Sequence, residues 1–227
     1  MIKNIVILLL LSGLFFLLFD KFGLKIKKNN KSGKIIILNG PSCAGKTSIQ
    51  KAFQSLMLQE NKFWIRLGID NLFDAPFPEI TLENIDYWTS KNDLRWIETL
   101  KDLEGNTIVP LKIGTEGEKV FYGMNKAIKG YLEAGNNIIL DYIAYDKKYI
   151  LDLIKIVSDY NYILVKVDIS LEELEKREIK RNTSPRGHGR SIYFTLHDSV
   201  DYDLVVDSEK NSPHEIAIEI KEFIEKR

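Results

Sequence analysis

The sequence predicts an α/β fold, a three-layer sandwich in which helices cover both faces of a mainly parallel, five-stranded sheet. The main observation is that short apolar runs, typical of buried strands, alternate with longer segments of helical periodicity. A glycine-rich turn joins the first apolar run, residues 35–38, to the first helical segment. No repeat or low-complexity stretch interrupts residues 34–227, so we expect one domain there.

The expected strands and helices follow one another along most of the domain. Gly135 is typical of a helix end, and the Ser-x-x-Glu sequences that begin at Ser170 and Ser212 are typical of capping boxes at helix starts. Strands are expected at residues 35–38, 62–67, 137–140, 162–167 and 204–206, and helices at residues 49–57, 117–134, 149–157, 170–181 and from residue 212 onwards.

The segment at residues 71–116 is less regular than the rest of the domain. Residues 81–88 and 92–101 could form short helices, whereas residues 103–113 have the pattern of a turn between short strands. Further along, residues 186–190 are basic and rich in glycine, so we expect a mobile loop there.

Residues 40–47 read G-P-S-C-A-G-K-T and match the pattern G-x-x-x-x-G-K-[ST] of a phosphate-binding loop. Gly40 and Gly45 would let successive backbone N–H groups face phosphate oxygens, and the following helix would add its own unpaired N–H groups. Lys46 would reach the β- and γ-phosphates of ATP, and the Thr47 hydroxyl would bind Mg²⁺. The strand before the loop and the helix after it predict a P-loop NTPase fold. The expected nucleotide site consists of Gly40, Pro41, Ser42, Cys43, Ala44, Gly45, Lys46, Thr47 and Ser48.

Charge and cysteine content exclude some classes of protein. The 32 Lys and Arg residues are balanced by 32 Asp and Glu residues, so the zero formal net charge argues against a nucleic-acid partner. Cys43 is the one cysteine and cannot form an internal disulfide, which suits a reducing compartment. Because it lies inside the phosphate loop, we interpret it as a small filling residue rather than a redox switch.

The N-terminus is predicted to form a hydrophobic helix. Residues 5–19 are almost entirely apolar, although the run is shorter than the ~20 residues that cross a bilayer. A cleaved signal peptide is the alternative, but no A-x-A-like cleavage site follows. Lysines cluster between residues 21 and 34, so the positive-inside rule keeps the rest of the chain on the cytoplasmic side. We expect an uncleaved anchor at residues 1–22, a basic linker at residues 23–33 and a domain at the cytoplasmic face of the membrane.

Two acidic residues follow expected strands, at the sheet edge where open α/β folds bind ligands. Asp141 resembles the acid that assists Mg²⁺ in phosphate-loop enzymes, but it could equally bond to nearby turn amides. Asp70 could take the proton of an acceptor hydroxyl as that oxygen attacks the γ-phosphate. Alternatively, Asp70 could cap a short helix at residues 71–73.

Arg177 and Arg181 lie four residues apart on an expected helix, so both can point to the same side. Over a nucleotide, the two guanidinium groups would neutralise charge on the phosphoryl group in transfer. Paired with Glu173 or Glu178, they could instead form an ordinary solvated helix face. The residues alone leave both interpretations open.

Other pieces of the sequence are more particular than the phosphate loop. They are LGIDNLF at residues 67–73, ILD at residues 139–141 and EKREIKR at residues 175–181. A tail at residues 196–220 contributes His197, Tyr202, Asp203 and Asp207.

In this order and spacing, the pieces resemble the chloramphenicol phosphotransferase-like family of P-loop kinases, from residue 34 to the C-terminus. The resemblance implies that the γ-phosphate of ATP is transferred to a hydroxyl of a small molecule, with Asp70 as the base and Mg²⁺ as the metal. It also implies that Arg177 and Arg181 belong to a lid over ATP, at residues 177–190. Residues 71–116 are then expected to form the acceptor site.

The sequence departs from the family pattern in the lid. The family commonly continues its second lid arginine as R-G-D-R, whereas N-T-S follows Arg181 here. Arg186 or Arg190 could replace the missing arginine, because both lie in the expected loop.

Other classes of function compete with a kinase. A membrane-tethered ATPase or nucleotide-dependent switch would lack an acceptor, and a tethered interaction protein would only hold nucleotide. The loop pattern could also be a glycine-rich turn that matches by chance. A GTPase is disfavoured, because residues 125–128 read N-K-A-I and lack the acid of the guanine-binding pattern N-K-x-D.

Overall fold

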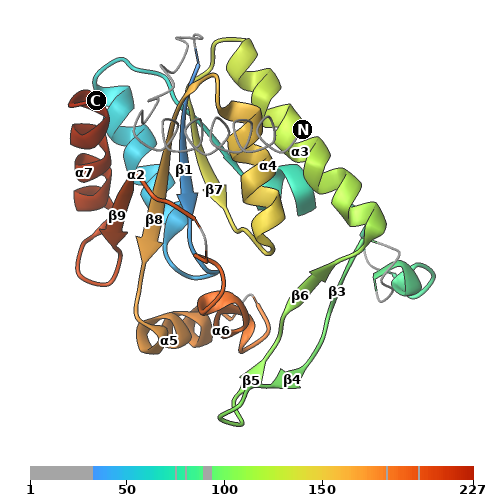
Figure 1. The fold of residues 1–227 in the computed structure, drawn as a ribbon. Helices are drawn as coiled ribbons and strands as arrows, with labels where there is room; N and C mark the ends of the chain where they lie inside the picture. The colour runs from blue at the N-terminus through green and yellow to red at the C-terminus, as the bar shows by residue number, and fades with distance from the viewer. Residues whose placement is uncertain (1–32, 75, 80, 89–93, 183, 199) are drawn as a thin grey trace, which may run out of the picture.

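The computed structural model describes residues 33–227, except residues 75, 80, 89–93, 183 and 199 (Figure 1). The anchor predicted at residues 1–22 and nearly all of the basic linker lie outside the described residues. Within the part that is described, no helix is both long and apolar enough to cross a bilayer. The anchor therefore stays a prediction.

A five-stranded sheet, in which all neighbouring strands are parallel, lies at the centre of the fold (Figure 1). The strand order is β2-β7-β1-β8-β9, so the strand that leads into the phosphate loop is the middle one. All residues of β1 except the first are buried, because helices cover both of its faces. The five predicted strands are confirmed, with small shifts at their ends. Their bounds are β1 Lys34–Asn39, β2 Ile65–Gly68, β7 Ile138–Tyr142, β8 Asn161–Asp168 and β9 Leu204–Asp207.

Helices cover both faces of the sheet, which confirms the predicted three-layer sandwich (Figure 1). On one face, α2 and α7 bury apolar side chains such as Phe53 and Ile220 against the strands. On the other face, α3 and α4 bury Phe121 and Leu153. The bounds of these helices are α2 Lys46–Gln59, α3 Thr115–Glu133, α4 Lys147–Val157 and α7 Pro213–Glu225.

The two predicted capping boxes turn out differently. At Ser212, before α7, both hydrogen bonds of the box are present. At Ser170, before α5 (Leu171–Arg181), the hydroxyl accepts from the Glu173 N–H at 3.2 Å, but the Ser170 N–H donates to Glu209. The prediction of a complete box at Ser170 is wrong, because the Glu173 carboxylate binds Arg177 instead.

Residues 95–113 form a narrow two-stranded arm that extends from the start of α3 towards α6 (Figure 1). The prediction of a helix at residues 92–101 is wrong for residues 94–101, the part that the structure describes, because two short strands lie there. Apolar residues recur every three positions in this segment, which imitates a helix, but pairing with a remote strand decides its conformation. The turn predicted between short strands at residues 103–113 is present at residues 103–105, but the strand before it ends at Lys101, outside the predicted range. β3 (Arg95–Ile97) pairs antiparallel with β6 (Leu111–Ile113), and β4 (Leu100–Lys101) pairs with β5 (Thr107–Ile108).

Three short helical segments complete the described chain. The helix predicted at residues 81–88 is a turn followed by a 3₁₀ helix, η2 (Ile85–Trp88). Directly after β2, residues Asp70–Asp74 form a π-helical turn, η1. The prediction of a loop at residues 186–190 is wrong for residues 188–190, because α6 (His188–Tyr193) begins there.

Candidate active site

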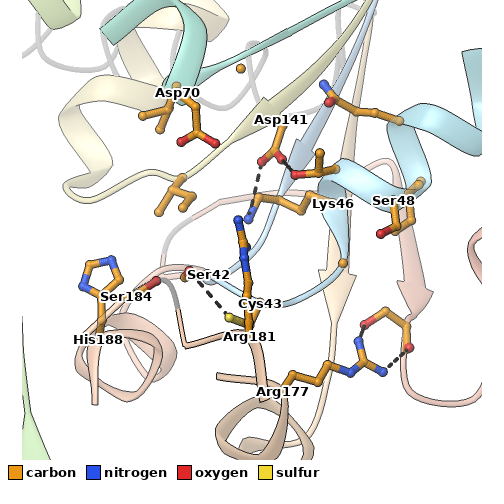
Figure 2. Close-up of a pocket in the computed structure, with 18 of the residues that line it drawn as sticks. Ser42, Cys43, Lys46, Ser48, Asp70, Asp141, Arg177, Arg181, Ser184 and His188 are labelled. Atoms are coloured by element: carbon orange, nitrogen blue, oxygen red, sulfur yellow. Dashed lines mark hydrogen bonds and ion pairs between the residues drawn. The ribbon is translucent and has the colours of Figure 1, made fainter. Parts of the chain in front are cut away.

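A cavity of about 1210 Å³ opens at the carboxyl ends of the strands (Figure 2). Asp70 of η1, Asp141 of β7, and Arg177 and Arg181 of α5 all line it. The residues predicted to act together therefore share one space. Of the predicted loop residues, Ser42, Cys43, Gly45, Lys46, Thr47 and Ser48 line the cavity, and Gly40, Pro41 and Ala44 are buried.

The phosphate loop has the shape that its two glycines permit. Gly45 has a φ of 92° and caps the start of α2 in the left-handed conformation, which most other residues adopt only with strain. At Gly40, a Cβ atom would lie 2.9 Å from the carbonyl oxygen of Val167. Cys43 also has a positive φ, 65°. The chain thus curls tightly between β1 and α2, as the sequence pattern predicts.

Lys46 is buried within the loop, with 4% of its surface exposed. Its ammonium group donates to the carbonyl oxygens of Gly40 and Pro41, both at 2.8 Å. The same nitrogen lies 3.5 Å from Oδ1 of Asp141. The positive charge is therefore held at the mouth of the loop, where a phosphate would sit.

Thr47 and Asp141 form the pair that the sequence predicts on the metal side. The Thr47 hydroxyl donates to Oδ2 of Asp141 at 2.7 Å. Asp141 lies in β7, where it is the register partner of Leu38 in β1 and of Gly68 in β2. One hydroxyl and one carboxylate suit a Mg²⁺ ion that takes its other oxygen ligands from water and phosphate. Among the described residues, no group of three or more His, Cys, Asp or Glu side chains could hold a metal without such help.

Asp70 is the first residue of η1, and its side chain is exposed to the cavity. Figure 2 shows the carboxylate directed into the space between η1 and the Lys46–Asp141 pair. None of the hydrogen bonds found among the described residues involves this carboxylate, so the helix-capping alternative has no support. A carboxylate in this position is free to accept a proton from a molecule in the cavity.

Three further side chains line the Asp70 end of the cavity, and sequence reasoning does not find any of them: Arg95, Tyr145 and His188. Arg95 forms an ion pair with Asp74. Burial raises the pKa of Asp74, the Arg95 charge lowers it, and the Asp70 charge raises it again. Burial also raises the pKa of Tyr145 far above its ordinary value. No local pattern marks these residues, because each comes from a different segment.

The two arginines of α5 both reach the cavity. Arg177 donates to Glu173 at 2.8 Å and to the carbonyl oxygen of Ser208 at 2.8 Å. Its guanidinium also lies beside the loop, 3.7 Å from the point where a Cβ atom on Gly45 would stand. Arg177 therefore combines the two predicted alternatives, since it is paired on its helix and still faces the phosphate loop. Figure 2 shows Arg181 extending across the cavity towards Lys46.

Arg190 does not take the place of the missing lid arginine. Its guanidinium binds Asp102 at 2.7 Å and Glu104 at 2.9 Å, both at the tip of the arm, and Glu175 of α5 at 3.0 Å. Neither Arg190 nor Arg186 lines the cavity. Arg190 instead joins the arm to the α5–α6 region.

The tail residues of the family pattern lie behind the phosphate loop. Asn39, fully buried at the end of β1, donates to the Tyr202 hydroxyl at 2.7 Å, and that hydroxyl lies 2.7 Å from Nδ1 of His197. Burial raises the pKa of Tyr202 to about 12. Asp203 accepts from the Leu164 N–H at 2.8 Å and so links the residue before β9 to β8. These residues brace the site from outside the cavity.

The glycine-rich loop at the end of the central strand, its lysine and threonine, and the acid on the neighbouring strand define a P-loop nucleotide-binding fold. The chain is similar to the APS kinase CysC of Mycobacterium tuberculosis in complex with AMPPNP and APS, with 15% identity, a TM-score of 0.57, and coverage of 86% of this chain and 98% of that one. It is also similar to shikimate kinase from Acinetobacter baumannii in complex with shikimate, with 13% identity, a TM-score of 0.52, and coverage of 86% of this chain and 95% of that one. A third similar structure is a gluconokinase of Sinorhizobium meliloti, with 16% identity, a TM-score of 0.51, and coverage of 87% of this chain and 94% of that one. At these identities the likeness shows the fold.

The chain belongs to the chloramphenicol phosphotransferase-like protein family, whose sequence pattern matches residues 33–225. Two proteins of Mycobacterium tuberculosis, one from each of two strains, are each 31% identical over 195 residues, which cover 84% of this chain and 81% of theirs. Both carry the name "Putative O-phosphotransferase". The chain is thus a kinase-type phosphotransferase, as the resemblance in its sequence predicted.

Proposed function

We propose that this protein transfers the γ-phosphate of ATP to a hydroxyl group of a small molecule, with Asp70 as the general base. The observation that carries the proposal is the shared cavity: the Asp70 carboxylate faces the same space as Lys46 and the Thr47–Asp141 pair (Figure 2). A base and a phosphate-binding loop on opposite sides of one space are what a direct transfer between two bound substrates requires.

On the nucleotide side, the loop from Gly40 to Ser48 would hold the triphosphate through its N–H groups and the start of α2. Lys46 would supply a positive charge to the β- and γ-phosphates, and Arg177 and Arg181 would neutralise charge from the α5 side. Thr47 and Asp141 would hold Mg²⁺, which when bound neutralises charge on the phosphate oxygens. The APS kinase structure in complex with AMPPNP supports this assignment by analogy of fold.

On the acceptor side, Asp70 would orient the hydroxyl and take its proton. The hydroxyl oxygen forms a bond to the γ-phosphorus as the bond from that phosphorus to the β–γ bridging oxygen breaks. ADP then leaves with the bond electrons, and the proton stays on Asp70 until it passes to water. The acceptor would lie between η1, β3 of the arm, and Tyr145, which together line this end of the cavity.

The Asp70→Asn variant tests the proposal. Release of ADP from Mg–ATP is measured with and without a panel of small hydroxylated acceptors. We expect at least one acceptor to stimulate ADP release by the wild type. In the variant this stimulated rate should be about a hundredfold to ten-thousandfold lower, because the asparagine amide cannot accept the proton of the hydroxyl. Binding of AMPPNP, an ATP analogue, should be unchanged. Asp201→Asn, at an exposed position away from the cavity, is the matched control.

Two outcomes would contradict the proposal. Hydrolysis of ATP that needs no acceptor and survives Asp70→Asn would indicate an ATPase or a nucleotide-dependent switch. A lack of any turnover, with AMPPNP still bound, would indicate a protein that only holds nucleotide.

A further inference from the structure

His188 is a buried polar side chain at the cavity wall that the proposed transfer does not use. It is the first residue of α6 and has 7% of its surface exposed. It lines the cavity, and Figure 2 shows the imidazole standing at the cavity wall on the α6 side. Its ring centre lies 6.0 Å from that of Tyr145, whose hydroxyl interacts electrostatically with the carboxylates of Asp74 and Asp70. His188 therefore belongs to the acceptor end of the cavity.

The hydrogen bonds of His188 determine which ring nitrogen carries a proton. Nδ1 lies 3.0 Å from the carbonyl oxygen of Val109 in the arm. A carbonyl oxygen only accepts hydrogen bonds, so Nδ1 is the donor. In the neutral ring Nε2 then has a free lone pair, and it has no hydrogen-bond partner among the described residues. Nε2 is not among the fully buried, unpaired polar atoms of the described residues, and His188 is one of the residues that line the cavity.

The position of His188 is fixed from several sides. Glu178, with 4% of its surface exposed, accepts from the N–H groups of Gly187 and Gly189, both at 2.7 Å. At Gly187, where φ is 91°, a Cβ atom would lie only 2.3 Å from the carbonyl oxygen of Thr107. Glycine at this position therefore lets the arm come close enough for Val109 to hold the imidazole. A ring fixed in this way loses little freedom when it binds a ligand.

We propose that His188 is a specificity-determining residue, whose Nε2 accepts a hydrogen bond from a second donor group on the acceptor alcohol. This inference rests on the proposed function. Asp70 and Nε2 of His188 are both hydrogen-bond acceptors, so the molecule between them presents two donors. The acceptor class is an alcohol with a second hydroxyl group, of which one is phosphorylated and the other is recognised.

Matched pairs of acceptors and two variants test this role. Each small diol or polyol is assayed beside the mono-O-methyl ether in which the second hydroxyl is capped. We expect the wild type to prefer the diol by about tenfold or more in kcat/KM, because the ether leaves Nε2 unpaired. His188→Asn keeps a donor where Nδ1 stands but has no atom at Nε2, so the preference should disappear through a higher KM for the diol. His188→Gln places an amide at the Nε2 position and should restore part of the preference, although it loses the bond to Val109.

The outcomes separate this inference from the proposed function. If His188→Asn and His188→Gln both abolish activity and both lower the melting temperature, His188 only anchors the arm and the inference is wrong. If the wild type phosphorylates diols and ethers equally, the inference is wrong although the proposed function stands. If the wild type phosphorylates nothing in the panel, the proposed function and the inference fall together. His214→Asn, at an exposed histidine of α7, should behave as the wild type in every assay.

Discussion

The two halves of the cavity are built in different ways. The nucleotide half consists of the loop at residues 40–48, which is continuous in sequence and follows a strand buried on both faces. The acceptor half is assembled from residues 70–74, the arm at residues 95–113, Tyr145 and His188, which lie far apart in the sequence. One half is thus fixed by the core of the fold, whereas the other depends on contacts between remote segments.

The contacts that hold the acceptor half are mostly polar. Much of the apolar surface of the arm is exposed, since Ile97 is 55% and Leu100 is 45% exposed, although Val109 is buried. Arg190, with 10% of its side chain exposed, binds three carboxylates there, and the Val109 N–H donates to the carbonyl oxygen of Gly187 at 3.0 Å. A part of a protein that depends on such contacts opens more easily than its core. The comparison predicts that the two halves respond differently to mutation and to pH.

The largest effect is expected in the nucleotide half, from Lys46→Ala. The change removes the Lys46 ammonium group, which is held at the mouth of the loop where negative charge moves during transfer. We expect turnover of Mg–ATP to fall about a hundredfold to a thousandfold, with the melting temperature little changed. Lys126→Ala, at an exposed position of α3, is the control. Full activity in Lys46→Ala would mean that the loop does not hold the phosphates.

The nucleotide half could be predicted because its information is local. The pattern at residues 40–47 specifies two glycines, a lysine and a threonine by spacing alone, and the apolar run before it is typical of a buried strand. Asp141 could be predicted for a related reason, since it follows an apolar run of the same kind and parallel strands end at the same edge. The structure brings this acid within 2.7 Å of Thr47.

In the acceptor half, the sequence predicts Asp70 and a broad segment, residues 71–116, but not the individual side chains that line the cavity, because their placement depends on tertiary contacts. Residues 94–101 fit a helix or a strand about equally well, and only pairing with residues 111–113 selects the strand. His188 lies in a segment rich in glycine, whose composition predicts a loop. Its burial depends on Glu178, ten residues earlier, and on Val109 in the arm, and no spacing rule connects these positions.

A smaller effect is expected from the histidine that braces the nucleotide half. Burial, and then the Lys166 charge, lower the pKa of His197 to about 4, whereas a histidine in an unfolded chain titrates near about 6.5. The unfolded chain therefore takes up the proton first, and stability falls as the pH decreases from about 6.5 to 4. The full shift is equivalent to roughly 3 kcal/mol, and partial exposure of the ring reduces the expected loss to about 1–2 kcal/mol.

His197→Asn isolates this contribution. The asparagine side-chain oxygen can accept from the Tyr202 hydroxyl but does not titrate, so the loss of stability between pH 7 and pH 4 should decrease by about 1–2 kcal/mol. Chemical denaturation at the two pH values measures the difference. An equal loss in the wild type and the variant would show that His197 is not held neutral in the folded protein.

The smallest effect is expected in the acceptor half, from Arg190→Gln. Loss of the guanidinium removes the link from Asp102 and Glu104 in the arm to Glu175 in α5. We expect faster amide hydrogen exchange at residues 100–109 and a KM for the acceptor raised about fivefold to tenfold, with the affinity for AMPPNP unchanged. Arg186→Gln, at an exposed position two residues before α6, is the matched control.

The two halves should also differ in the pH at which their stabilising contacts are lost. Burial raises the pKa of Asp102, but the hydrogen bonds from Arg190 and Asn106 outweigh it and hold the pKa at about 2. An unfolded aspartate titrates near about 3.9, so this contact is complete above about pH 4 and is lost as the pH falls towards 2. The bracing of the nucleotide half by His197 weakens already between about pH 6.5 and 4. Hydrogen exchange of the arm should therefore stay slow at pH 4, where most of the stability that depends on neutral His197 has already been lost. Fast exchange at residues 100–109 already at pH 5 would show that Arg190 does not hold the arm in place.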